Sequence, residues 1–310
     1  MGGGFGGKES QGNLPAIVAA LAANLTGRPA KIIYDRDDDF ILTGKRHDFQ
    51  ISYKVGFGDD GSIESLIVDQ AMRCGMSWDL SEAIAARAMC HAENSYFIKN
   101  MRITSHRLKT NTQSNTAFRG FGGPQGIVGM ERVIDHVAHH LNVDPLLVRE
   151  RNFYPHKTST KHGSTPYGQT VHDCIIQDIT SELKKTSNYL ERRKDIDKFN
   201  QDSDFLKRGI ALTPVKFGIS FNASFLNQAG ALLHIYNDGS VYLNHGGTEM
   251  GQGLNTKIAQ VVANEFQLPL DKIKITATST GKVPNTSATA ASSGSDLNGM
   301  AAKNAAETSH

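Results

Sequence analysis

Along most of the chain, apolar positions recur with a period typical of either helices or strands. Helical spacing covers residues 14–26, 129–141, 145–153 and 254–266. Strand-like segments cover residues 31–34, 50–57, 62–72, 230–236, 240–245 and 272–276. Two pairs of these segments flank the turn sequences Gly58-Asp59-Asp60-Gly61 and Asn237-Asp238-Gly239, which predicts hairpins. The pattern therefore predicts an α+β fold rather than a doubly wound parallel sheet.

The pattern becomes polar between residues 155 and 205, where residues 183–200 predict a very polar helix. We expect a first domain over 1–155, a connecting segment with a peripheral helix over 156–205, and the N-terminal part of a second domain over 206–310. The chain opens on a glycine loop and stops within an alanine-rich helix at 300–309. Because neither end is typical of a domain end, we expect a fragment or the product of a split gene.

Composition narrows the class of protein. The 310 residues are 39% hydrophobic and 21% charged, which is typical of globular proteins with a sizeable core. The 33 basic and 31 acidic side chains give a net charge of +2, so electrostatics does not favour a nucleic-acid or anionic-membrane partner. The sequence also lacks an apolar run of bilayer length and the apolar segment of a signal peptide. We therefore predict a cytoplasmic protein.

Cysteine and histidine positions do not predict a metal site held by side chains. Cys74, Cys90 and Cys174 are odd in number and include no CxxC pair, which favours a reducing compartment and buried thiols rather than a zinc or iron–sulfur site. His136 and His140 have the i, i+4 spacing of some zinc ligands, with His139 between them. The sequence has no HExxH motif or further carboxylate to complete that set, so we expect ordinary histidines on a helix face.

Glycine and small polar residues are concentrated in loops at 2–7, 119–123, 246–247, 249–253 and 290–294. Glycine lets the main chain approach a ligand and present N–H groups to it. Gly251-Gln252-Gly253 directly precedes a predicted helix, where its amides are able to receive a phosphate. Several such loops predict one large polar cofactor held mainly by main chain, although any single loop is also compatible with a tight turn. The GxGxxG spacing of Gly2, Gly4 and Gly7 lacks the upstream strand of a dinucleotide fold.

Long motifs at the same loops resemble the xanthine dehydrogenase and aldehyde oxidase family. They are GGGFGGKE at 2–9, TNTQSNTAFRGFGGPQG at 110–126, KFGISF at 216–221, LNQAGALLHIYNDGSV at 226–241, HGGTEMGQGLNTK at 245–257 and VPNTSATAAS at 283–292. The resemblance runs nearly end to end and is weakest over 155–205. It implies two molybdopterin-binding domains from inside the family's large molybdenum subunit, the second of them incomplete.

The resemblance also implies how the cofactor is held. In this family molybdenum is bound by molybdopterin, so no cluster of protein ligands is expected. The main chain around Phe5 and Gly6, with Arg119 and Ala291, matches positions close to the molybdenum but without a side-chain ligand. The family positions that contact the pterin and its phosphate correspond to Gln252, Ser292 and Ser295.

Other matching positions imply a purine substrate. A planar ring that gains negative charge requires aromatic faces, a carboxylate for its nitrogens and a nearby cation. Glu9 and Arg87 match the family's purine-binding pair, and Phe121 and Phe221 match the aromatic pair around the ring. Asn222 stands where threonine is expected.

From the pattern alone, each of these residues also has a structural interpretation. Glu9 is able to complement a helix dipole, Arg87 to be an exposed helix charge, and Phe121 and Phe221 to be core residues.

The implied activity is molybdenum-dependent hydroxylation of hypoxanthine to xanthine and of xanthine to urate. Arg87 is the candidate for charge stabilisation, whereas the family's general-base glutamate lies in a GEPP-type segment that this sequence does not contain. The [2Fe-2S] clusters and FAD of the family, with NAD as final acceptor, are expected on other domains or subunits. We therefore expect the chain alone to be inactive. An inactive scaffold segment, or a family hydroxylase of another heterocycle or an aldehyde, remain alternatives.

Overall fold

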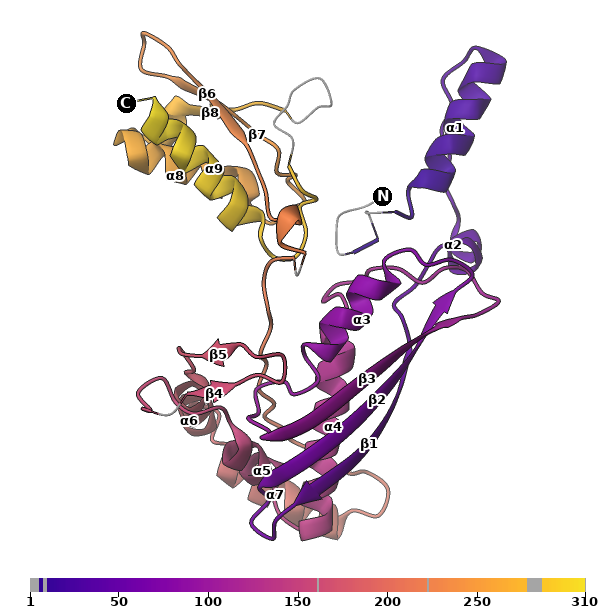
Figure 1. Ribbon diagram of the computed structural model, residues 1–310, viewed down its shortest axis with the longest axis vertical. Coiled ribbons are helices and arrows are strands. Elements are labelled where there is room, and N and C mark those ends of the chain that lie inside the picture. The colour runs from indigo at the N-terminus through magenta and orange to yellow at the C-terminus, as the bar shows by residue number, and fades with distance from the viewer. Residues whose placement is uncertain (1–5, 8–9, 161, 222, 278–285, 310) are drawn as a thin grey trace. The chain divides into compact units, whose positions relative to one another are not determined.

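The computed structural model describes residues 6–7, 10–160, 162–221, 223–277 and 286–309, and Figure 1 shows its helices and strands. The chain divides into a larger unit, Asn13–Phe217, and a smaller unit, Met1–Gly12 with Gly218–His310. Each unit combines helices with a sheet, which confirms the predicted α+β class. Among the described residues, every helix is too short or too polar to cross a bilayer.

The larger unit is built around a sheet with the strand order β1-β2-β3. Its strands are β1 (Phe49–Phe57), β2 (Ile63–Gly75) and β3 (Asn100–Lys109), and α3 (Ser81–Met89) connects β2 to β3. β1 and β2 form the predicted antiparallel hairpin. β2 and β3 are parallel, and a parallel pair requires a crossover such as α3.

One face of this sheet is buried because alternate side chains of β2 point toward helices. Figure 1 shows α3 and α4 (Gly123–Leu141) on the same side of the strands. Leu66 and Val68 of β2 pack with Val133, Ile134 and Val137 of α4, all at most 5% exposed. Full burial of one such side chain contributes roughly 1.5–3 kcal/mol, so this cluster holds α4 on the sheet.

The polar stretch after α4 contains more separate helices and strands than predicted. It contains α5 (Pro145–Asn152), the short strands β4 (Gly163–Ser164) and β5 (Thr170–Val171), α6 (Ile176–Thr186) and α7 (Tyr189–Asp202). Asp144 caps α5 as predicted, since its side chain accepts a hydrogen bond from the Leu146 amide at 2.8 Å. The predicted single helix over 183–200 is wrong. Asn188 adopts a left-handed conformation (φ 53°), which a right-handed helix does not tolerate, and it separates α6 from α7.

The region before β1 contains α1 (Asn13–Thr26) and α2 (Arg36–Leu42). α1 confirms the helix predicted over 14–26. The buried strand predicted over 31–34 is wrong, because these residues form no strand and the Ile33 side chain is 76% exposed. The prediction of buried thiols holds for Cys74, whereas Cys90 and Cys174 are only half-buried.

The smaller unit repeats the order of elements seen in the larger one. It contains β6 (Ala231–Ile235), β7 (Val241–His245), α8 (Leu254–Phe266), β8 (Ile273–Ile275) and α9 (Gly294–Thr308), with 3-10 turns at Ser224–Leu226 and Leu270–Lys272. β6 and β7 form the predicted hairpin, and β8 runs parallel to β7 after the α8 crossover. Leu243 and Ile258 are fully buried between this sheet and its helices. Each unit therefore contains, in this order, a hairpin, a crossover helix, a parallel strand and a further helix, and the larger unit has additional elements before and after them.

Candidate functional site

In the larger unit, glycine presses the loop before α4 directly against α3. Gly122 has φ +93°, and a Cβ atom there would lie 2.1 Å from the carbonyl oxygen of Ile84. A Cβ atom at Gly126 would lie 2.4 Å from the carbonyl oxygen of Ala88. Because no other residue permits this approach, the loop and α3 are held at a fixed distance. Arg87 is one of the three α3 residues between Ile84 and Ala88 in the sequence.

Arg87 is a buried cation rather than an exposed helix charge. The residue is 6% exposed, and its guanidinium carbon lies 5.4 Å from the centroid of the Phe217 ring. Burial lowers the pKa of Arg87, yet an arginine stays protonated at physiological pH. A cation at this distance from a ring face is attracted by the ring quadrupole. The structure thus holds a positive charge in a site partly shielded from water.

Two aromatic residues beside Arg87 were not among the predicted site residues. His91 donates a hydrogen bond from Nδ1 to the Arg87 carbonyl oxygen at 2.7 Å, and its ring lies 5.1 Å from that of Phe217. Burial lowers the pKa of His91, as do the nearby Lys216 and Arg87 cations, so the neutral imidazole is favoured. Phe217 falls within the KFGISF motif, and that motif is the sequence signal by which it could have been identified as a site residue. The local sequence around His91 gives no comparable signal.

A buried ion pair fixes the main chain next to Phe217. Lys216 pairs with the fully buried carboxylate of Glu93, and its ammonium also donates to the carbonyl oxygen of Cys90 at 3.3 Å. The Lys216 amide donates to the Asn94 side chain at 3.0 Å. Burial raises the pKa of Glu93, and Lys216 opposes that rise. These contacts tie Phe217 to the turn that follows α3.

The predicted residues Arg119 and Phe121 lie in the glycine loop itself. Phe121 is a non-glycine residue with φ 51°, an uncommon conformation that is often found at functional sites. Its half-buried ring packs on a small core that includes Ile84, so it also has the structural role considered above. The exposed Arg119 accepts a hydrogen bond at its carbonyl oxygen from Arg46 at 2.7 Å. The structure therefore places Arg87, Arg119 and Phe121 on two elements in direct contact.

In the smaller unit, the loops that contain the other predicted residues are joined by hydrogen bonds. The Ser220 amide, next to Phe221, donates to the carbonyl oxygen of Ala291 at 2.9 Å. The Thr248 amide donates to the Thr289 hydroxyl at 2.9 Å, which links the loop before α8 to the loop before α9. Figure 1 shows these loops at one end of the β6-β7-β8 sheet. Phe221, Gln252, Ala291, Ser292 and Ser295 thus belong to one group of connected loops.

The start of α9 has a donor set that fits an anionic cofactor. Ala291 and Ser292 are consecutive non-glycine residues with φ 54° and 57°, and α9 has no side-chain cap among the described residues. The first amides of a helix have no partner within the helix, and they attract anions. Ser292 and Ser295 are exposed and add hydroxyl donors. Asp296 shares this turn, so amide and hydroxyl donors rather than net positive charge would hold an anion.

The start of α8 differs from the prediction. We expected the Gly251-Gln252-Gly253 amides to receive a phosphate, but the Glu249 carboxylate accepts from the amides of Gly251 at 2.8 Å and Gly253 at 3.0 Å. It also accepts from the Asn255 amide at 3.0 Å. These backbone hydrogen bonds hold the pKa of Glu249 below its usual range. The chain thus supplies its own anion at this helix start.

Phe5, Glu9 and Asn222 lie outside the described residues, whereas Gly6 is described and has φ 104°.

The histidines of α4 have ordinary partners, since His136 hydrogen-bonds Tyr53 and the His140 ring packs edge-on to Phe57. Within the described ranges no group of three or more His, Cys, Asp or Glu is able to hold a metal ion. The expectation that these are ordinary histidines on a helix face stays a prediction.

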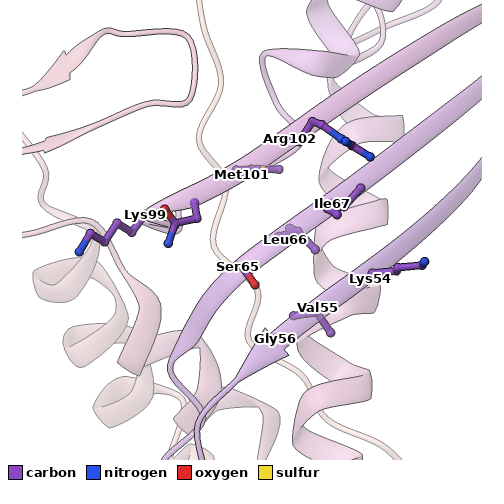
Figure 2. A pocket seen from close by; sticks show the side chains of 10 residues that line it. Lys54, Val55, Gly56, Ser65, Leu66, Ile67, Lys99, Met101 and Arg102 are labelled. Carbon is purple, nitrogen blue, oxygen red and sulfur yellow. The ribbon is translucent and has the colours of Figure 1, made fainter.

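A shallow hollow of about 630 Å³ lies on the exposed face of the β1-β2-β3 sheet, away from the glycine loop. Figure 2 shows that Lys54, Lys99 and Arg102 extend around it. It contains none of the predicted site residues, so we do not assign the cofactor or the substrate to it.

Comparison with known proteins agrees with the predicted fold. Two family models, each described as "Molybdopterin cofactor-binding domain", match residues 1–153 and 182–309. The chain is 47% identical to "Xanthine dehydrogenase 1" of Arabidopsis thaliana over 99% of its own length and 22% of that protein. It is 48% identical to "Xanthine dehydrogenase/oxidase" of Mus musculus over 99% of its length and 23% of that protein. The chain thus spans between a fifth and a quarter of the length of these relatives.

Solved structures show the same fold at lower sequence identity. Quinoline 2-oxidoreductase from Pseudomonas putida 86 superposes with a TM-score of 0.83 at 22% identity, covering 99% of this chain and 40% of that one. The aldehyde oxidoreductase from Desulfovibrio desulfuricans superposes with a TM-score of 0.83 at 24% identity, covering 99% and 33%. The solved structures show the shared fold. The two family models, with the 47–48% identity to xanthine dehydrogenases, show that the chain belongs to the xanthine dehydrogenase and aldehyde oxidase family and forms two of its molybdopterin cofactor-binding domains.

Proposed function

We propose that the chain provides the molybdopterin loops and the purine-recognition residues of a molybdenum hydroxylase that converts hypoxanthine to xanthine and xanthine to urate. The observation that carries this proposal is the buried Arg87 guanidinium, which lies over the Phe217 ring on the helix that the loop of Phe121 contacts. A fixed cation beside an aromatic loop suits a planar ring that gains negative charge. The relatives named xanthine dehydrogenase, at 47–48% identity, support the same substrate class.

The chain's own residues have separate tasks in this proposal. When bound, the molybdenum cofactor supplies the oxidation and oxygen-transfer chemistry. The residues assigned to holding it, through main chain and hydroxyl groups and without a side-chain metal ligand, are Phe5, Gly6, Arg119, Gln252, Ala291, Ser292 and Ser295. Arg87 stabilises the charge that develops on the purine, and Phe121 and Phe221 cover the faces of its ring. Glu9 and Asn222 orient its polar edge.

Activity also depends on groups outside this chain. The relatives are four to five times longer than the matched region, which covers 22–23% of them. We propose that the general-base glutamate, the [2Fe-2S] clusters and the FAD come from other segments or subunits, and that NAD accepts the electrons. The isolated chain of 310 residues is then inactive, and the cytoplasmic location stays a prediction. Steady xanthine turnover by the isolated chain would contradict this.

The first test is analysis of the chain purified from its native host with the polypeptides that copurify. Molybdenum and pterin near one per chain, together with iron–sulfur and flavin partners, would support a hydroxylase. Absence of molybdenum and of partners would favour the inactive scaffold.

The second test compares two arginines that each lie over an aromatic ring. Arg87→Met in the assembled enzyme removes the buried cation, whereas Arg107→Met removes an exposed one that lies 5.6 Å from the Trp78 ring centroid. By analogy with loss of a transition-state charge donor, we expect Arg87→Met to lower kcat/KM for xanthine by about 10²–10³-fold with molybdenum content unchanged. Arg107→Met should change it less than about twofold. A preference for aldehydes or quinolines over purines in the unsubstituted enzyme would favour the alternative substrate class.

A further inference from the structure

The turn that follows α3 holds a short segment from a distant part of the chain. Both ends of the fully buried Asn94 amide take part. Its nitrogen donates a hydrogen bond to the carbonyl oxygen of Pro214 at 2.9 Å, and its oxygen accepts one from the main-chain amide of Lys216 at 3.0 Å. These partners lie 120 and 122 residues after Asn94 in the sequence. The main chain directly before Phe217 is therefore attached to the end of α3.

The Lys216 side chain completes this attachment. Its ammonium pairs with the fully buried carboxylate of Glu93, and it donates to the carbonyl oxygen of Cys90 at 3.3 Å and to the hydroxyl of Tyr167 at 3.1 Å. A buried ion pair adds little net stability, because the cost of removing two charges from water offsets their attraction. It does demand one geometry, because either charge left alone would be very unfavourable. The pair therefore fixes a position more than it stabilises the fold.

The ring of Phe217 lies beside Arg87 but is not enclosed by a core. Its centroid is 5.4 Å from the guanidinium carbon of Arg87 and 5.1 Å from the centroid of the His91 ring. A Cβ atom at Gly123 would lie 2.6 Å from the Phe217 ring, so glycine lets the ring rest on the start of α4. The Phe217 side chain is still 40% exposed. Apolar enclosure alone does not fix it, and its position depends on the main chain that Lys216 anchors.

We propose that Glu93 and Lys216 are positioning residues, which hold the Phe217 ring over Arg87 and so set the direction of the guanidinium. The task of Arg87 itself rests on the proposed function. An arginine side chain has several rotatable bonds, and attraction to a ring face restricts them. Charge stabilisation requires accurate placement, because a displacement of about 1 Å is able to cost about 10²-fold in rate. Glu93 and Lys216 act on the reaction through Phe217 and Arg87.

The first test compares two lysine–glutamate pairs in the assembled enzyme. Glu93→Gln with Lys216→Met removes the pair next to Phe217 without leaving one buried charge alone. We expect kcat/KM for xanthine to fall by about tenfold, with molybdenum content unchanged. The fall should be in kcat rather than in KM, because the charge that Arg87 meets develops in the transition state.

The matched control removes a pair of the same chemistry in the same unit. Lys184 and Glu150 lie 2.7 Å apart, and their side chains are 30% and 31% exposed. Glu150→Gln with Lys184→Met should change kcat/KM less than about twofold, because a pair in contact with water contributes little. A fall equal to that of the first variant would overturn the proposal.

The second test removes the same buried pair from the Arg87→Met enzyme. If the pair acts through Arg87, its removal there should lower kcat/KM by less than about twofold more, because effects that share one partner are not additive. A further loss of about tenfold would show that the pair supports the structure without acting through Arg87. That result would overturn the proposal.

The third test does not depend on the substrate. Burial and the Phe217 ring shield Arg87 from phenylglyoxal, a reagent that modifies arginine. Removal of the buried pair should raise the labelling rate of Arg87, followed by peptide mass spectrometry, by at least about tenfold, since a shielded group reacts only when it opens locally. The Glu150 and Lys184 control should not raise it.

Phe217→Leu provides the same readout with the ion pair intact, and it decides the matter if the first variant does not fold. It removes the ring face and should also raise the labelling of Arg87. Unchanged labelling in the variants that fold would overturn the proposal. If Arg87→Met left xanthine turnover unchanged, the proposed function would fail, whereas the labelling rate of Arg87 would still decide whether Glu93 and Lys216 position it.

Discussion

The two units share one order of elements but differ in how tightly the glycine loops are packed. In the larger unit, Gly122 lies against the main chain of α3, where an added Cβ would approach the Ile84 oxygen to 2.1 Å. In the smaller unit, Gly251 and Gly253 also have positive φ, yet a Cβ at either position would meet nothing within 4 Å. Glycine therefore makes a close main-chain contact in the loop before α4 and leaves open space at Gly251 and Gly253 in the loop before α8.

The loops before α4 and α9 therefore have different structural roles. The closed loop fixes side chains, because it holds Phe121 against the helix that carries the buried Arg87. In the smaller unit the start of α9 after Ala291 has no side-chain cap, whereas Glu249 occupies the amides of Gly251 and Gly253 at the start of α8. In both units the loop before the helix that follows the parallel strand, α4 or α9, contains a non-glycine residue in the left-handed region. These residues are Phe121 at φ 51° and Ala291 at φ 54°. We infer that the loop before α4 fixes the position of side chains, whereas the loop before α9 presents main-chain donors.

The largest expected difference concerns the ion pairs that involve α4 in the larger unit and α9 in the smaller unit. In the larger unit, Arg149 is 2% exposed and pairs with Glu131 at 2.8 Å and Asp135 at 2.9 Å on α4. Arg149→Met would leave the half-buried Glu131 carboxylate without its cation. We expect the free energy of unfolding of this unit to fall by about 3–5 kcal/mol. Urea denaturation of the 310-residue chain measures it.

The matched control is Lys303→Met in the smaller unit. Lys303 of α9 lies 3.7 Å from Glu265 and 3.6 Å from Glu307, but it is 39% exposed. Water screens such pairs, so we expect a loss below about 1 kcal/mol. Equal losses for the two variants would refute the idea that only the larger unit depends on a buried network.

A smaller difference is expected when alanine replaces glycine. Gly122 and Gly251 have nearly the same φ, +93° and +96°, so alanine is strained by a similar amount in both loops, by about 1–2 kcal/mol. At Gly122 the clash with Ile84 is added, and we expect a total loss of about 3 kcal/mol or more. Thermal unfolding followed by circular dichroism compares the two variants. Similar melting temperatures would show that the Gly122 contact is easily relaxed.

The sequence predicted regular segments well where the signal was local. The hairpins and the helix over 254–266 follow from turn residues and short-range spacing, and they agree with the structure. β3 and α3 were not predicted, because β3 carries many polar residues and gains its stability from pairing with β2. The buried strand expected at Ile33 is wrong because apolar character alone does not provide a partner strand.

The candidate site was predicted mainly through family motifs rather than through physical pattern. Periodicity alone left Arg87 as an exposed helix charge, since its burial depends on Phe217, distant in the sequence. The repeated order of elements in the two units was also invisible, because the loops between equivalent elements differ in length and sequence. At Glu249 the sequence pattern predicted a binding site where the structure shows that the chain fills the position itself. A phosphate-binding helix start was predicted at α8, but a carboxylate four residues before Gly253 already occupies those amides.

The smallest expected effect tests that occupied helix start. Glu249 accepts backbone hydrogen bonds in its charged form, which lower its pKa in the folded chain below the ordinary value of 4.5. A depressed pKa of an acid stabilises the folded state at pH values above 4.5, and that contribution disappears as the pH falls through the folded-state pKa. Glu249→Gln should therefore lower the melting temperature by a few degrees at neutral pH and progressively less in acid.

The control is Glu64→Gln, which changes an exposed carboxylate on β2. It should leave the melting temperature nearly unchanged at every pH, because no helix start depends on that charge. If Glu249→Gln lowered the melting temperature equally at neutral and acidic pH, its carboxylate charge would not be what closes the α8 helix start. The loss of stability would then come from the packing or the hydrogen bonds of residue 249 and not from a negative charge that the chain supplies to the Gly251 and Gly253 amides.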